Sequence, residues 1–198
     1  MTQAHDANGS KLGMWLFLFS EIMLFGGLFV LYAVYLAEFT PAFVSAGKEL
    51  SAAMGTANTA ILLISSFTAA ASIPAIQSGS RKAALGFLGA TLFMGAVFLV
   101  NKYIEWGAKF AAGVYPNSPG LAGGEPGRNI FFALYYTVTG LHGLHVAIGM
   151  ILLAICLVMT ARGKISAGRH AWLENSALYW HLVDLIWIFV FPLFYLIV

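Results

Sequence analysis

The chain has 198 residues, of which 60% are hydrophobic and 9% are charged, and its formal net charge is +2. Soluble domains carry roughly 25% charged residues, so a chain this poor in charge cannot cover its surface with water-compatible side chains. The composition therefore indicates an integral membrane protein, and the small net charge gives no support to nucleic-acid binding. The single cysteine, Cys156, lies in an apolar run, which excludes a disulfide framework within the chain.

Five apolar segments are long enough to cross a bilayer as helices, which takes about 20 residues each. They are too long and too continuous to be the alternating strands of a membrane barrel, which have about 10 residues. We therefore predict an all-α bundle of five transmembrane helices over residues 13–198, preceded by a cytoplasmic segment over residues 1–12. In chain order, the predicted spans are 13–36, 55–76, 83–103, 130–160 and 176–198.

The connections between these segments differ in length. The second and third spans are joined by a very short polar turn, so these two helices are expected to form an antiparallel hairpin. Residues 107–128 hold three prolines and six glycines, which predicts a loop. The polar start of the chain has neither the cleavage pattern of a signal peptide nor the arginines of a transit peptide, which favours direct insertion into a bacterial plasma membrane.

Orientation follows from the lysines and arginines, which are enriched in cytoplasmic connections. With the N-terminus inside, six of these residues lie on the inner side and four on the outer side. This arrangement places the C-terminus in the periplasm. The inner residues are Lys11, Arg81, Lys82, Arg162, Lys164 and Arg169, and the outer residues are Lys48, Lys102, Lys109 and Arg128.

Four of the five predicted helices carry polar groups at comparable depth. Glu21 lies about 12 Å above the inner end of the first helix, at 1.5 Å per residue. Polar groups in lipid are costly and therefore face inward and pair with one another, so one polar layer inside the bundle is expected. Its other members are Ser65 and Ser66 on the second helix, His142 and His145 on the fourth, and His181 and Asp184 on the fifth.

Helical spacing groups further residues around this layer. His142, His145 and Gly149 share one face of the fourth helix, and Gly140 and Gly143 lie beside it, where they permit close helix approach. Asn58 is assigned with Ser65 and Ser66 to helix packing. At the outer end of the third helix, Lys102 and Glu105 stand three residues apart beside Trp106, which predicts an interfacial ion pair with an aromatic anchor.

The polar layer has three alternative interpretations. It can be structural, with hydrogen bonds that fix which helices pack together. It can be a metal site, although the ferritin-like ligand pattern requires Glu-x-x-His pairs and this chain offers His-x-x-His and His-x-x-Asp. It can handle protons through Glu21, because removal from water disfavours the charged form of a carboxyl group unless a nearby histidine takes its proton.

Five stretches of the sequence together resemble subunit III of haem-copper oxidases. They occur in that family's order and cover nearly every predicted helix. They are LFLFSEIMLF (16–25), NTAILLISS (58–66), KYIEW (102–106), TGLHGLHVAIG (139–149) and YWHLVDLIWIF (179–189). Many members of the family have seven helices, whereas this chain corresponds to the last five. A lipid-holding cleft formed by the absent pair is therefore not carried over, and in some five-helix relatives the extra helices belong to subunit I.

The resemblance implies a non-catalytic subunit that binds no cofactor of its own, with haems and copper in partner subunits. It implies direct packing on subunit I, association with subunit II and further small subunits, and assistance to proton uptake on the inner side. Glu21 matches the family's buried carboxyl group, whereas His142, His145, His181 and Asp184 match motif residues with a packing role.

The type of oxidase and the class of protein have alternatives. Glu21 in its motif and the Glu105–Trp106 pair resemble the cytochrome c type, and the alternative is a quinol oxidase or a nitric-oxide-reductase-associated system. Outside this family, an independent membrane metalloenzyme or a small carrier remains as an alternative. No internal duplication supports a carrier.

Overall fold

The computed structural model describes residues 2–196, so the last two residues of the fifth predicted span and Met1 lie outside it. Within the described residues the fold is helical throughout, with a single isolated bridge between Ser166 and Arg169. The elements are α1 (Thr2–Glu38), α2 (Thr40–Gly47), α3 (Ala52–Gln77), α4 (Arg81–Ala111), α5 (Pro119–Ala122), α6 (Pro126–Ala161) and α7 (Ala171–Tyr195).

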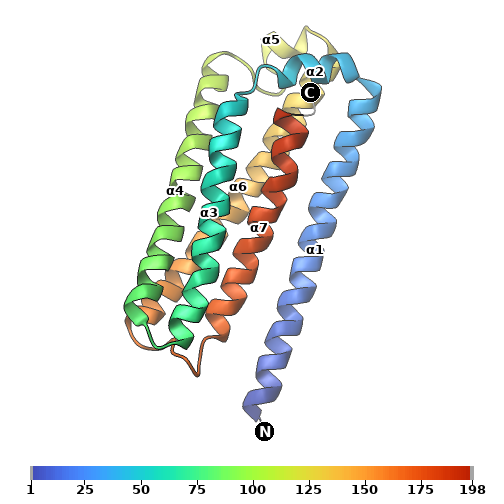
Figure 1. The fold of residues 1–198 in the computed structure, drawn as a ribbon. Helices are drawn as coiled ribbons and strands as arrows, with labels where there is room; N and C mark the ends of the chain where they lie inside the picture. Colours follow the sequence, from blue (N-terminus) through green and yellow to red (C-terminus); the bar gives the residue numbers. More distant parts are fainter. Residues whose placement is uncertain (1, 197–198) are drawn as a thin grey trace.

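Five of the described helices, α1, α3, α4, α6 and α7, are long and apolar enough to cross a membrane. This confirms the predicted all-α bundle of five transmembrane helices. Figure 1 shows them as one elongated bundle, with the N-terminus at one end and the C-terminus, α2 and α5 at the other. We call these ends the N-terminal end and the C-terminal end. The α3–α4 turn and the α6–α7 loop both lie at the N-terminal end.

Several helices are longer than the predicted spans. α1 begins at Thr2, and α4 continues to Ala111, inside the segment predicted as a loop over 107–128. The same segment also contains the short helix α5. A helix does not stop where the lipid stops, because its backbone hydrogen bonds continue for as long as the dihedral angles permit. The apolar run in a sequence therefore gives the minimum length of a membrane helix.

The helix ends have local causes. α3, α4 and α6 are each followed by a glycine with a positive φ, namely Gly79 (79°), Gly113 (71°) and Gly163 (72°). Residues other than glycine rarely adopt this backbone conformation, and a glycine at this position caps the C-terminus of a helix. α6 begins at Pro126, whose fixed φ and missing N–H suit the first turn. These residues fix where the chain reverses.

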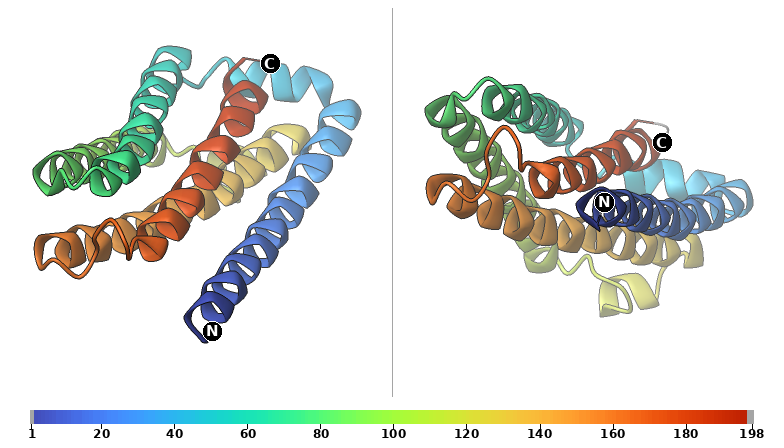
Figure 2. Two further views of the ribbon diagram at one scale, coloured as in Figure 1. Left: turned by 60° about the horizontal axis from the view of Figure 1, so that its bottom comes forward. Right: turned by 90° about the horizontal axis from the view of Figure 1, so that it is seen from below.

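The helices are not packed equally. α3, α4, α6 and α7 contact one another closely, whereas α1 contacts α6 and α7 more sparsely. Figure 2 shows α1 diverging from the other four helices toward its N-terminus. At the other end, the Tyr32 hydroxyl donates to the carbonyl oxygen of Leu193, which ties α1 to α7. α1 is therefore anchored at the C-terminal end and leaves much of its apolar surface uncovered by this chain.

Candidate functional site

Glu21 is held by His145. The carboxyl oxygen Oε2 of Glu21 on α1 lies 2.8 Å from Nε2 of His145 on α6, and both side chains are largely buried. The other ring nitrogen, Nδ1, lies 2.7 Å from the carbonyl oxygen of Leu141. A carbonyl can only accept, so Nδ1 carries a hydrogen. Nε2 therefore either accepts a proton from a neutral carboxyl group or donates one to a carboxylate, and in both cases the two residues share one proton.

Aromatic rings enclose this pair. The Phe25 ring meets the His145 ring edge-on at 5.4 Å, and the Tyr179 ring stacks on it at 6.5 Å. The Tyr179 hydroxyl also donates to the backbone carbonyl of His145, at 3.3 Å. The pair is thus fixed in orientation by α1, α6 and α7 together.

A second polar contact joins α3 to α7. The hydroxyl oxygen of Ser66 lies 2.6 Å from Nδ1 of His181. The neighbouring Ser65 accepts a hydrogen bond from the indole N–H of Trp180 at 3.1 Å and donates to the Leu62 carbonyl. The two serines thus bind two adjacent side chains of α7.

Two further members of the predicted polar layer have no such contact. His142 is fully buried between the rings of Phe98 (5.5 Å) and Trp187 (5.1 Å), and neither ring nitrogen has a hydrogen-bond partner among the described residues. Asp184 is also buried and lies beside the Ser66 hydroxyl. Neither of its carboxyl oxygens makes a hydrogen bond of normal distance and angle within the described part of the chain.

The layer expected from the sequence is therefore divided. Glu21 and His145 meet between α1 and α6, whereas Ser66 and His181 meet between α3 and α7. No hydrogen bond between described residues joins the two groups into one network. The reason is geometric, since His142 and His145 are three residues apart on α6 and yet point at different neighbours.

Lys102 and Glu105 form the predicted ion pair, with 2.8 Å between Nζ and Oε2, but the pair is buried inside the bundle. The pair thus faces the interior of the bundle, and its predicted level at the membrane interface stays a prediction. Nζ also donates to the hydroxyl oxygens of Tyr135 on α6 (3.0 Å) and Tyr195 on α7 (2.9 Å). Both hydroxyls in turn donate to Oε1 of Glu105. The expected anchor, Trp106, turns inward onto Tyr136.

Sequence reasoning missed the two tyrosines that complete this network. Tyrosines near the ends of membrane helices are typically interfacial anchors. The position of Tyr195 in the sequence does not distinguish it from such an anchor. Tyr135 carried a usable signal, because it precedes His142 by seven residues and so lies on the same face of α6. The side-chain amide of Asn101, which donates to Oδ1 of Asn58 at 2.8 Å, was also missed.

The three glycines predicted to permit close helix approach behave differently. A Cβ at Gly149 would lie 2.8 Å from the Trp180 ring, and one at Gly140 would lie 3.1 Å from the Trp106 ring. A Cβ at Gly143 would meet nothing within 4 Å, so within the described chain Gly143 does not serve close packing. Gly149 in particular gives room for a tryptophan of α7.

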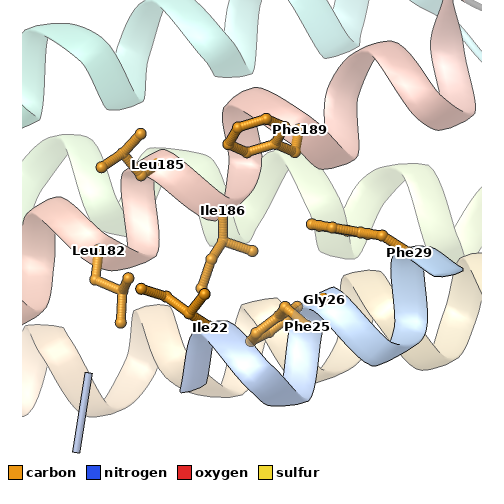
Figure 3. A pocket seen from close by; sticks show the side chains of 8 residues that line it. All are labelled: Ile22, Phe25, Gly26, Phe29, Leu182, Leu185, Ile186 and Phe189. Carbon is orange, nitrogen blue, oxygen red and sulfur yellow. The ribbon is translucent and has the colours of Figure 1, made fainter. Parts of the chain in front are cut away.

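The sparse contact between α1 and α7 leaves an apolar pocket of about 310 Å³. Figure 3 shows side chains from the two helices facing one another across it. Its lining offers no hydrogen-bonding or charged side chain that would orient a polar substrate. The lining residues are Ile22, Phe25, Gly26 and Phe29 of α1 and Leu182, Leu185, Ile186 and Phe189 of α7.

Metal binding requires several histidine, cysteine, aspartate or glutamate side chains to converge on one point. Among the described residues, no three of the histidine, cysteine, aspartate and glutamate side chains converge in a way that could hold a metal ion. His142, His145 and Asp184 lie on neighbouring helices, but His145 uses both nitrogens in other contacts. These side chains do not form a ligand set in this arrangement.

The fold and these contacts define a class of protein: a membrane-spanning helical bundle whose buried polar groups are directed at one another and at its own backbone. A family model described as "Cytochrome c oxidase subunit III" matches residues 2–197. The chain belongs to this family, the subunit III proteins of haem-copper oxidases, which are oxidoreductases.

Similar proteins include members of two kinds of oxidase. The chain is 30% identical over 194 residues to "Cytochrome bo(3) ubiquinol oxidase subunit 3" of Pseudomonas aeruginosa, covering 98% of this chain and 88% of the relative. It is 32% identical over 201 residues to "Cytochrome c oxidase subunit 3" of Synechocystis, covering 98% and 80%. It is also 32% identical to part of "Heme-copper oxidase subunit I+III" of Aeropyrum pernix, covering 93% of this chain and 22% of the relative.

Proposed function

We propose that this chain is a non-catalytic subunit of a terminal oxidase, which packs directly on subunit I and leaves the haems and copper to partner subunits. The observation that carries the proposal is the family match over residues 2–197. A relative whose name joins subunits I and III in one chain supports direct association with subunit I. The exposed apolar surface of α1 and the absence of polar groups in the α1–α7 pocket fit a packing role better than a substrate site.

Purification of the chain with its native partners tests this proposal. An affinity tag on the chain is expected to retrieve subunit I and subunit II, together with a reduced-minus-oxidised haem spectrum. After the partners are removed with a stronger detergent, the isolated chain is expected to show no haem spectrum and no stoichiometric metal. A chain that is retrieved alone, and that carries one equivalent of iron, copper or zinc, would instead support an independent metalloenzyme.

Cytochrome c is the proposed electron donor of the complex. The stretch around Glu21 and the Glu105–Trp106 pair favour this type, and the relative from Synechocystis carries the corresponding name. The alternative, a quinol oxidase, is favoured by the similarity to the relative from Pseudomonas aeruginosa. Oxygen uptake by the purified complex with reduced cytochrome c, compared with ubiquinol, separates the two. Turnover with ubiquinol alone would establish the alternative.

Glu21 is proposed to assist proton uptake by the complex. Its shared proton with His145, at 2.8 Å, is the supporting observation. Glu21→Gln keeps the shape and can still hydrogen-bond to the imidazole, but it cannot release a proton. The variant is expected to assemble normally and to lose turnover or to inactivate sooner, and an infrared carboxyl band is expected to disappear. Unchanged turnover and lifetime would remove the proton role and leave the packing role standing.

The proposed location is a bacterial plasma membrane, with the N-terminus in the cytoplasm and the C-terminus in the periplasm. The structure brings the two most basic connections and the N-terminus to the same end of the bundle, which suits a cytoplasmic end. Ser80→Cys in the α3–α4 turn is expected to react with an impermeant reagent only from the cytoplasmic side. The native Cys156 is buried and is not expected to contribute background labelling. Labelling of residue 80 in intact spheroplasts would reverse the orientation.

A further inference from the structure

The α3–α4 turn and the α6–α7 loop lie against one another at the N-terminal end of the bundle. The side-chain amide of Gln77, at the end of α3, lies 3.2 Å from Nε2 of His170, just before α7. The Arg81 guanidinium group lies against Gly163, 3.7 Å from the position that a Cβ would take there. Figure 2 shows the two connections as neighbours when the bundle is viewed from this end. Residues distant in sequence are thus assembled into one surface.

This surface carries five exposed cations that no aspartate or glutamate among the described side chains neutralises. None of the five charged groups makes an ion pair or a side-chain hydrogen bond to another described residue. Residues 78–82 and 161–170 contain no aspartate or glutamate, and the nearby Glu174 is held by His170 at 3.2 Å. We call this surface the basic patch; it consists of Arg81, Lys82, Arg162, Lys164 and Arg169.

The C-terminal end of the bundle has the opposite character. It carries four cations and four glutamates. Arg128 pairs with Glu49 at 3.0 Å, and Lys102 pairs with Glu105 at 2.8 Å. Lys109 donates to the backbone carbonyl of Glu49 at 2.6 Å. Three of the four cations at that end are therefore used within the chain, whereas all five of the basic patch remain available for a ligand.

The position of the basic patch identifies the kind of ligand. Arg81 is the first residue of α4, and Arg162 directly follows α6, so both stand where membrane-spanning helices leave the apolar core. Trp172, in the first turn of α7, is 60% exposed beside the patch, and exposed tryptophans are typical of the headgroup level of a membrane. Clusters of lysine and arginine at this level attract anionic lipids.

We propose that the basic patch binds the phosphate headgroup of an anionic phospholipid in the adjoining leaflet. Guanidinium groups bind phosphate oxygens in pairs, and ammonium groups supply further donors. One headgroup that bridges the α3–α4 turn and the α6–α7 loop holds the two hairpin ends together. The site depends on the chain spanning a membrane and not on its role in an oxidase.

The test uses the complete oxidase complex in lipid nanodiscs, with a donor dye on Ser166→Cys in the α6–α7 loop. The acceptor is a chain-labelled phosphatidylglycerol, compared with phosphatidylcholine that carries the same label at the same mole fraction. Phosphatidylglycerol is expected to transfer several-fold more energy per molecule. Lys164→Gln is expected to lower this preference by up to about fivefold, because each surface cation contributes about that factor. The matched control, Lys48→Gln, removes one exposed charge at the other end and is expected to leave the preference unchanged.

Two further measurements identify the attraction. High salt is expected to reduce the preference in the native chain toward that of Lys164→Gln, because salt screens exposed charges. Inorganic phosphate is expected to act no more strongly than chloride at equal ionic strength. Equal transfer from both lipids, or an equal loss in Lys48→Gln, would overturn the proposal. Specific competition by free phosphate would show that the patch binds a soluble anion instead of a lipid.

Discussion

Two sets of buried polar groups in this bundle differ in how completely they are satisfied. Near the C-terminal end, Lys102 donates all three of its ammonium hydrogens, and the carboxyl group of Glu105 accepts from three donors. We call this set, with Tyr135 and Tyr195, the closed network. In the middle of the bundle, His142 and Asp184 are also buried, and neither makes a hydrogen bond of normal distance and angle to another described residue, although Asp184 lies beside the Ser66 hydroxyl.

The difference shows which buried groups determine the helix arrangement. The closed network takes members from α4, α6 and α7, and each member requires the others, so it favours one packing of these helices. A buried group without a partner loses its contacts with water and gains none, so it adds cost without specifying a neighbour. We therefore expect substitutions in the two sets to have opposite consequences for stability.

The largest effect is expected from Glu105→Gln, which leaves the Lys102 charge buried without its counter-charge. Breaking a buried ion pair in this way costs about 3–5 kcal/mol. Unfolding can be followed with a thiol-reactive fluorogenic dye, because Cys156 is fully buried and reacts only when the bundle opens. A native unfolding temperature in Glu105→Gln would contradict the assignment of the closed network as a stabilising element.

The double variant Lys102→Met/Glu105→Leu serves as the control. It removes both charges at once, and the two tyrosine hydroxyls, 3.4 Å apart, can still bind each other. Replacing a whole buried ion pair by apolar residues is often neutral or stabilising, so the double variant is expected to recover most of the stability lost in Glu105→Gln. A double variant as unstable as Glu105→Gln would mean that packing and not charge causes the loss.

The next effect concerns Glu21, whose partner His145 has both ring nitrogens in contacts, one to Glu21 and one to the Leu141 carbonyl. Glu21→Ala leaves Nε2 of His145 buried without an acceptor or donor, at a cost of about 1–3 kcal/mol. This loss is expected to appear as weaker retention of the chain by subunit I in purification. Glu21→Gln keeps a partner for the imidazole and should be retained like the native chain, and equal loss in both variants would point away from this hydrogen bond.

Much of the fold was predictable from the sequence, because lipid exposure demands long apolar helices. The five spans and the short α3–α4 hairpin follow from composition and from the six-residue separation of residues 76 and 83. The eight-residue helix α2, at the C-terminal end, was not predicted. Short helices are stabilised by packing rather than by their own sequence, and the buried Phe43 contacts Tyr32 and Phe131, which no local pattern reveals.

The candidate site was predictable only in depth. Spacing along the helices predicts polar groups at similar heights, but height does not determine which helices are neighbours or how each is rotated. His142, His145 and His181 were equivalent as partners of Glu21, and the structure selects His145 because α1 crosses that face of α6. The closed network was missed because the sequence alone does not show whether a tyrosine near the end of an apolar helix makes its hydrogen bond inside the bundle or at the membrane interface.

An effect of similar size is expected at one of two glycines of α6, and the comparison distinguishes a closely packed glycine from one with open space around it. Gly149→Ala drives a methyl group to 2.8 Å from the Trp180 ring, and overpacking of this kind typically costs about 1–3 kcal/mol. Gly143→Ala meets nothing within this chain and is expected to be neutral or slightly stabilising, because alanine favours a helix over glycine. The dye assay on the isolated chain compares the two, and equal destabilisation would disprove the distinction.

The smallest effect, and the opposite sign, is expected from His142→Leu. The imidazole lies between the Phe98 and Trp187 rings, with both nitrogens unpartnered among the described residues. Leucine is similar in volume and carries no polar atom, so the substitution removes a desolvated group without leaving a partner unsatisfied. The dye assay is therefore expected to show an unfolding temperature equal to the native one or slightly higher. Phe98→Ala, which opens a cavity beside the same ring, serves as the control and is expected to cost about 3–5 kcal/mol.

The outcome at His142 also bears on the metal alternative. If His142→Leu destabilised the bundle as strongly as Glu105→Gln does, the imidazole would have a binding partner that belongs to neither α6 nor its described neighbours. Elemental analysis of the native complex and of this variant would then distinguish a metal from a partner side chain, since only a metal ligand changes the stoichiometry when it is lost. A neutral substitution with unchanged metal content leaves His142 as an aromatic packing residue. In that case, the order within the bundle comes from the closed network and the Glu21–His145 pair, which have partners, and not from the residues that lack them.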